Sequence, residues 1–146
     1  MKILANEQQL EEEARALLLT LTPSERATIL ALHGDLGAGK TAFTQALARE
    51  LGITETVVSP TFVIMKVYDL SGQIYERLIH IDAYRLDDAR ELSVLGWSDM
   101  IQEPGNLIVV EWAERVKDIL PIDATHIYFE HGKDDTRTIR YDNKEN

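Results

Sequence analysis

The chain has 146 residues, 45% of them hydrophobic, which suits one soluble globular domain with one sizeable core. Its net charge of −10 disfavours unaided binding to nucleic acid, and the absence of cysteine excludes disulfides and thiolate metal sites. No apolar run reaches the roughly 18 residues of a transmembrane helix, and the start turns acidic too early for a secretory signal, so we expect a cytoplasmic protein without membrane association.

The predicted elements alternate between helix and strand. Apolar residues at helical spacing indicate helices over residues 6–21, 43–51, 87–95 and 114–120. Apolar or β-branched runs between turn residues indicate extended segments over residues 28–33, 54–58, 63–70, 74–81, 107–110, 125–131 and 136–141. The wholly apolar run at 107–110 is typical of a central parallel strand. We therefore expect an α/β protein with a single domain over residues 1–146, of which 142–146 form a polar tail.

A glycine-rich loop lies between the strand at 28–33 and the helix that follows. Residues 34–41 read GDLGAGKT and match the phosphate-binding pattern G-x-x-x-x-G-K-S/T without a mismatch. Glycines let the backbone approach a phosphate, and the helix N-terminus adds partial positive charge. In such a loop the lysine, here Lys40, contacts the β- and γ-phosphates, and the Thr41 hydroxyl binds magnesium. We expect Lys40 to be exposed when no nucleotide is bound.

Polar residues follow several of the predicted strands. Asp82 and Glu111 come directly after apolar strands, and Thr61 follows the extended segment at 54–58. Ligands of doubly wound sheets bind at the carboxyl ends of the strands, so these side chains are expected near the loop. One carboxylate would hold magnesium while the other orients the attacking water, and the pattern leaves open which does which. Trp112, beside Glu111, is expected near the site, whereas the histidines are assigned structural or solvent roles.

The chain also resembles the TsaE family, the small bacterial ATPases of tRNA threonylcarbamoyladenosine biosynthesis. The matching segments lie in family order: GDLGAGKT at 34–41, SPTF at 59–62, HIDAYRL at 80–86, Glu91 with Gly96, and EWAER at 111–115. The loop alone is shared with many other proteins. The SPTF and H-x-D-x-Y-R segments make the resemblance specific.

This resemblance implies a P-loop NTPase fold, with a central parallel sheet flanked by antiparallel strands and helices on both faces. It implies an ATPase, slow alone, that drives cycling of the TsaB–TsaD threonylcarbamoyl-transfer complex, which itself would hold the tRNA. The cofactors would be ATP and Mg²⁺, with Lys40, Asp82 and Glu111 as catalytic residues and residues 59–62 as a switch loop. The metal would lie near Thr41, Glu111 and Asp82, the last a Walker B-like carboxylate. The residues implied to contact ATP are Gly34, Asp35, Leu36, Gly37, Ala38, Gly39, Lys40, Thr41, Ala42 and Thr61.

Other nucleotide-binding classes fit the sequence less well. A small-molecule kinase needs an acceptor pocket under an arginine-bearing lid, but Arg85 and Arg90 are the only candidates near the motifs and no lid-sized insertion exists. A GTPase switch needs an Asn-Lys-x-Asp motif, and residues 143–146 read NKEN, without the aspartate, so ATP is expected over GTP. The paired carboxylates disfavour a nucleotide-dependent switch that lacks turnover.

Overall fold

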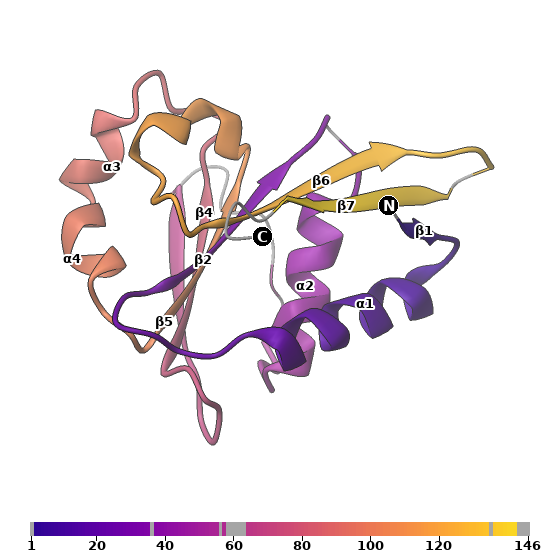
Figure 1. The fold of residues 1–146 in the computed structure, drawn as a ribbon, viewed down its shortest axis with the longest axis horizontal. Helices are drawn as coiled ribbons and strands as arrows, with labels where there is room; N and C mark the ends of the chain where they lie inside the picture. Colours follow the sequence, from indigo (N-terminus) through magenta and orange to yellow (C-terminus); the bar gives the residue numbers. More distant parts are fainter. Residues whose placement is uncertain (1, 36, 56, 58–63, 135, 143–146) are drawn as a thin grey trace.

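A mixed seven-stranded sheet with the strand order β1-β7-β6-β2-β5-β4-β3 forms the centre of the structure (Figure 1). The computed structural model describes residues 2–35, 37–55, 57, 64–134 and 136–142. The strands are β1 (Lys2–Leu4), β2 (Thr28–His33), β3 (Met65–Asp69), β4 (Arg77–Asp82), β5 (Asn106–Glu111), β6 (Thr125–His131) and β7 (Arg137–Asp142). Strands β6, β2, β5 and β4 are mutually parallel, while β3 pairs with β4, and β7 with both β6 and β1, in antiparallel fashion.

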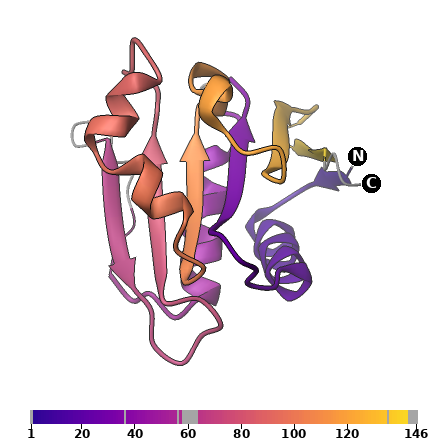
Figure 2. The ribbon, with the colours of Figure 1, turned by 60° about the vertical axis from the view of Figure 1, so that its left-hand side comes forward.

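Helices cover both faces of this sheet, as Figure 2 shows. They are α1 (Glu7–Thr20), α2 (Lys40–Glu50), α3 (Arg90–Val94), α4 (Trp97–Ile101) and the 3₁₀ helices η1 (Ala113–Arg115) and η2 (Lys117–Ile119). Alternate residues of β2 pack on opposite faces of the sheet. Leu30 packs with α1 and α2 on one face, and Ile29 packs with α3, α4 and η1 on the other. This alternation explains why the central strands are apolar throughout, because both of their faces are buried.

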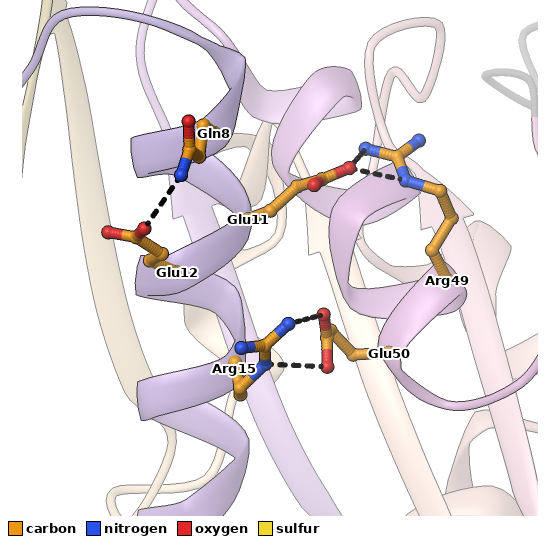
Figure 3. A network of polar contacts seen from close by, with 6 residues as sticks. All are labelled: Gln8, Glu11, Glu12, Arg15, Arg49 and Glu50. Atoms are coloured by element: carbon orange, nitrogen blue, oxygen red, sulfur yellow. Dashed lines mark hydrogen bonds and ion pairs between the residues drawn. The ribbon is translucent and has the colours of Figure 1, made fainter.

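Helices α1 and α2 lie side by side and are joined at their exposed edge by ion pairs (Figure 3). Arg15 donates two hydrogen bonds of 3.1 Å to the Glu50 carboxylate, and Arg49 Nε donates to Glu11 Oε1 at 2.9 Å. Such exposed pairs each contribute little to stability, about 0–1 kcal/mol. Burial of Leu10, Ala14 and Leu17 therefore contributes more than the ion pairs to holding α1 on the sheet and α2.

Several predicted elements differ from the structure. Strand β1 was not predicted, since its three residues are too few to show a period and only Leu4 is buried. Residues 54, 55 and 57 lie outside any strand. The helix expected at 114–120 is replaced by η1 and η2, because Val116, with φ −129°, interrupts the helical backbone between them.

The remaining differences are shifts of element boundaries. Strand β4 begins at Arg77, later than expected, and includes Asp82. The helix expected at 87–95 is shorter, and Gly96 separates it from α4, which was not predicted, by adopting a φ of 91°. Asp142 was assigned to a polar tail but is the last residue of β7, paired with His126. None of the helices in the described part of the chain has the length and apolarity to cross a membrane.

Candidate nucleotide-binding site

The carboxyl ends of β2, β5 and β4 meet at one edge of the sheet. Glu111 is in register with both Leu32 of β2 and Asp82 of β4. A cavity of about 370 Å³ opens at this edge. The predicted site residues that line it are Gly37, Gly39, Lys40, Thr41, Ala42, Asp82 and Glu111. The fold thus brings the glycine-rich loop and both carboxylates to one place.

The glycine-rich loop connects β2 directly to α2. At Gly34 a Cβ atom would lie 2.6 Å from the carbonyl oxygen of Phe129, so no other residue fits between the loop and β6. Gly39 has a φ of 117° and precedes the first residue of α2. The N-terminus of α2, with its free N–H groups, therefore lies at the cavity, as an anion-binding loop requires.

Lys40 is buried in the loop, with 4% of its surface exposed, so the expectation of an exposed lysine is wrong. Its Nζ donates hydrogen bonds to the carbonyl oxygens of Gly34 and Asp35 and lies 4.1 Å from the centroid of the Trp112 ring. The loop thus folds back on its own lysine, and the indole covers it. Burial lowers the pKa of Lys40, against the opposing effect of the Glu111 carboxylate.

Glu111 is the centre of a hydrogen-bonded chain across three elements. Thr41 Oγ1 of α2 donates to Glu111 Oε1 at 2.7 Å, and His80 Nε2 of β4 donates to Glu111 Oε2 at 2.5 Å. His80 is fully buried, and its Nδ1 has no hydrogen-bond partner among the described residues. The sequence pattern places His80 at a strand end near the nucleotide but assigns it a structural or solvent role. Residues two apart in a strand share a face, so His80 lies on the same face as Asp82.

Asp82 is the second carboxylate at the site, in register with Glu111 on the neighbouring strand. It is 5% exposed, and its Oδ1 accepts a hydrogen bond from the Tyr84 backbone N–H at 3.0 Å. The Tyr84 ring lies 5.0 Å, centroid to centroid, from that of Trp112, and both residues line the cavity. Trp112 has a φ of 57°, a left-handed conformation that a bulky residue adopts only under constraint. As expected from its position next to Glu111, Trp112 lies at the site, and Tyr84 was missed.

A histidine pair lies beside the loop rather than in it. His33 bonds Glu114 through Nδ1 at 2.9 Å and His126 through Nε2 at 2.8 Å. Burial alone would raise the pKa of Glu114, but the hydrogen bond from His33 and the charge of Lys40 lower it below its usual value. The structural or solvent role expected for these histidines stays a prediction.

The residues at the cavity fit magnesium and a nucleotide. Thr41, Glu111 and Asp82 present oxygen atoms, the ligands that Mg²⁺ prefers, beside the helix N-terminus. Within the described residues no group of three or more His, Asp or Glu side chains forms a metal site by itself.

The other predicted site residues contribute less to the cavity wall. Gly34, Asp35 and Ala38 belong to the loop, where Asp35 O accepts hydrogen bonds from Lys40 Nζ and from the Ala38 N–H. Leu36, Thr61 and the predicted switch loop at 59–62 lie outside the described residues. Arg137, which no motif indicated, also lines the cavity.

Comparisons with known proteins identify the family. The model of the family described as "Threonylcarbamoyl adenosine biosynthesis protein TsaE" matches residues 4–139. The tRNA threonylcarbamoyladenosine biosynthesis protein TsaE of Bacillus subtilis (strain 168) is 40% identical over 131 residues, 89% of this chain and 79% of that protein. The Rickettsia bellii protein of the same name is 32% identical over 143 residues, 97% of this chain and 94% of that protein. With the Rickettsia felis relative, 38% identical over 82% of this chain, the match spans only 66% of the relative's length.

A solved structure supports the same conclusion. The crystal structure of Bacillus subtilis YdiB superposes with a TM-score of 0.76 and 31% sequence identity, covering 96% of this chain and 82% of that one. The predicted P-loop α/β fold is thereby confirmed. The chain belongs to the TsaE family of tRNA threonylcarbamoyladenosine biosynthesis proteins.

Proposed function

We propose that the chain is a magnesium-dependent ATPase that supports tRNA threonylcarbamoyladenosine modification. The observation that carries this proposal is the convergence of Lys40, Thr41, Asp82 and Glu111 on one cavity at the carboxyl edge of the sheet. A charged lysine, a hydroxyl and paired carboxylates beside a helix N-terminus are the groups that phosphoryl transfer to water requires. Thr41 and one of the two carboxylates would hold Mg²⁺, which would supply positive charge against the charge that develops on the phosphate.

Each side chain has a role that follows from its contacts. Lys40 would exchange its bonds to the Gly34 and Asp35 carbonyls for bonds to the β- and γ-phosphates. Glu111 accepts a hydrogen bond from the Thr41 hydroxyl, which favours Glu111 as the carboxylate on the metal side. Asp82, its neighbour in the sheet, would then orient the attacking water.

The proposed partners are the TsaB–TsaD pair. The chain is strongly acidic, with a net charge of −10, which supports a partner complex rather than this chain as the holder of tRNA. A cavity of about 370 Å³ is within the roughly 300–1,000 Å³ usual for ligand sites, which supports a site for one nucleotide. Hydrolysis that modifies no second substrate in this chain would be coupled to cycling of the partner complex.

The test measures both ATP hydrolysis by this chain and tRNA modification by the partner complex. For ATP hydrolysis, Asp82→Asn and Glu111→Gln keep side-chain shape and remove charge, so the rate should fall by roughly 10²–10³-fold while ATP still binds. In a reconstituted assay, modified tRNA is counted per TsaD, with the parent, without this chain and with Lys40→Ala. Multiple turnovers should require the parent and ATP. Full modification without this chain, or with Lys40→Ala, would refute the proposal.

A further inference from the structure

Arg137 is the first residue of β7 and lies directly against the glycine-rich loop. A Cβ atom built on Gly39 would be 2.9 Å from Arg137 Cδ and 3.3 Å from its Nε. The arginine is half-buried and lines the same cavity as Lys40 and Thr41. Glycine at position 39 thus serves two purposes, because its φ of 117° suits the start of α2 and its missing side chain leaves room for Arg137.

Among the residues that the structure describes, the guanidinium of Arg137 has no acidic partner, unlike those of five other arginines. The arginine–carboxylate pairs are Arg15–Glu50, Arg26–Asp123, Arg49–Glu11, Arg77–Glu76 and Arg90–Asp88. Within the part of the chain that the structure describes, no carboxylate forms an ion pair with Arg137 and no side-chain hydrogen bond involves it. In a chain of net charge −10, a half-buried guanidinium that pairs with no described carboxylate and lies beside an anion-binding loop is suited to a ligand anion.

We infer that Arg137 binds the diphosphate of the bound nucleotide, its α- and β-phosphates; the inference rests on the proposed ATP site. The placement follows from the loop. Backbone N–H groups of a glycine-rich loop cradle the α- and β-phosphates, whereas the lysine reaches the β- and γ-phosphates. Arg137 lies on Gly39, and the carboxylates that would serve the γ-phosphate come from β4 and β5 instead.

This inference makes the last hairpin part of the nucleotide site. His131 of β6 is in register with Arg137, and its ring lies 3.8 Å from the position of a Cβ on Gly37. The β6–β7 hairpin therefore borders the loop along its glycines. The antiparallel pairing of β7 with β1 at Leu4 fixes the backbone of Arg137 independently of its side chain.

Binding calorimetry with ADP and with ATP tests the assignment. Arg137→Gln removes the guanidinium and should weaken both nucleotides by about 10- to 100-fold, the usual value of a charge-assisted hydrogen bond. Arg140→Gln is the matched control, since it removes the same charge from the same strand. Arg140 is exposed, does not line the cavity, and its guanidinium lies 4.3 Å from the Tyr128 ring centroid. Its affinities should stay within twofold of the parent. Arg137→Lys keeps the positive charge but loses the planar guanidinium, so its ADP and ATP affinities should lie between those of the parent and of Arg137→Gln.

The outcomes separate the two proposals. Parent-like ADP and ATP affinity of Arg137→Gln, in a parent that binds ATP, would overturn the role of Arg137 and leave the ATPase intact. A loss confined to ATP would also overturn it, because the contact would then be to the γ-phosphate. No nucleotide binding by the parent would refute the ATP site and this inference together. If Arg137→Gln melts below the assay temperature, Arg137→Lys decides: parent-like affinity contradicts the assignment, and a shared loss for ADP and ATP supports it.

Discussion

His80 Nε2 lies 2.5 Å from Glu111 Oε2, and the same carboxylate accepts a hydrogen bond from Thr41 at 2.7 Å. The buried histidine therefore fixes the orientation of a carboxylate whose other oxygen faces the proposed metal ligand. Because Glu111 is 2% exposed, water cannot replace His80 as the donor without a change in packing. We therefore expect His80 to be a positioning residue, which acts on the site through Glu111.

Removing this donor should change the magnesium dependence of ATP hydrolysis. His80→Leu leaves Glu111 free to rotate, so we expect kcat to fall and the half-saturating Mg²⁺ concentration to rise by roughly 10–100-fold, as for other partners of metal ligands. Hydrolysis is measured against Mg²⁺ concentration, and ATP binding is measured by calorimetry without Mg²⁺. Binding without Mg²⁺ should stay near the parent value.

The control for this change is His80→Gln. The glutamine amide places an N–H near the position of Nε2, so it should recover much of the rate and of the Mg²⁺ affinity. If both variants only lower the melting temperature and keep the parent magnesium dependence, His80 is a packing residue without a role at the site.

The sequence predicts the parts of this site that are local and misses those that depend on pairing between distant segments. Strands β2 and β6 have the predicted bounds, 28–33 and 125–131, because continuous apolar runs mark buried strands. Asp82 and Glu111 were placed at strand ends by the same logic. The contact of His80 with Glu111 depends on the pairing of β4 with β5, which no local pattern specifies.

Arg137 was missed for a related reason. It belongs to the last strand, and only the order β7-β6-β2 brings that strand to the loop after β2. The burial of Lys40 was missed because it depends on the path of the loop backbone and on contact with Trp112. Trp112 adopts a φ of 57°, which cannot be predicted from the sequence. Motifs thus predicted most of the residues that line the cavity, and tertiary pairing decided which residues support them.

Replacing the buried lysine should stabilise the protein while it abolishes nucleotide binding. The pKa of Lys40 is lowered chiefly by burial, so the folded state holds the charged form at a cost. That cost is present at neutral pH and disappears as pH rises through the lowered pKa towards 10.5, the ordinary lysine value. Lys40→Met fills the same space without charge and should gain roughly 0.5–2 kcal/mol at pH 7.

Urea unfolding at pH 7, with and without ATP, checks this prediction. The parent should gain stability on adding Mg²⁺ and ATP, and Lys40→Met should gain none. Arg49→Met is the control, since it removes a positive charge from the exposed end of the same helix. A loss of stability in Lys40→Met alone would show that the bonds of Lys40 to the loop carbonyls outweigh its burial.

Tyr141 should make the protein less stable at alkaline pH. Burial, together with the hydrogen bond that its hydroxyl donates to Glu13 at 2.6 Å, raises the pKa of Tyr141 well above its ordinary value of 10.0. The folded state then keeps a proton that the unfolded chain loses. Its contribution to stability is therefore complete below pH 10 and declines above it, by about 1.4 kcal/mol per pH unit.

The free energy of unfolding, measured by chemical denaturation from pH 8 to 11, is compared between the parent and two variants. Tyr141→Phe should cost about 1 kcal/mol at pH 8 and should show a shallower decline above pH 10. Glu13→Gln keeps an acceptor and removes the charge, so its decline should be intermediate. Equal slopes in the parent and Tyr141→Phe would mean that the Tyr141–Glu13 bond is absent in solution.

The last prediction concerns the proposed TsaB–TsaD pair. A ligand shifts an equilibrium only by its difference in affinity for two states, so an ATPase that drives cycling must bind its partners differently with and without ATP. Coupling between two binding sites is commonly worth about 5- to 150-fold in affinity. We expect a change of that size in the Kd of the parent for TsaB–TsaD when Mg²⁺ and ATP are added.

Variants of the site separate binding from hydrolysis in this measurement. Asp82→Asn, which should bind ATP and turn it over slowly, should show the full change in Kd and hold it over time. Lys40→Met should bind the partners equally with and without ATP, because it no longer binds the nucleotide. Arg140→Gln should behave as the parent, since its charge lies outside the cavity. A partner affinity that does not change with ATP, in a parent shown to bind it, would separate the ATPase from cycling of the modification complex. A change that persists in Lys40→Met would place the nucleotide on the partners instead.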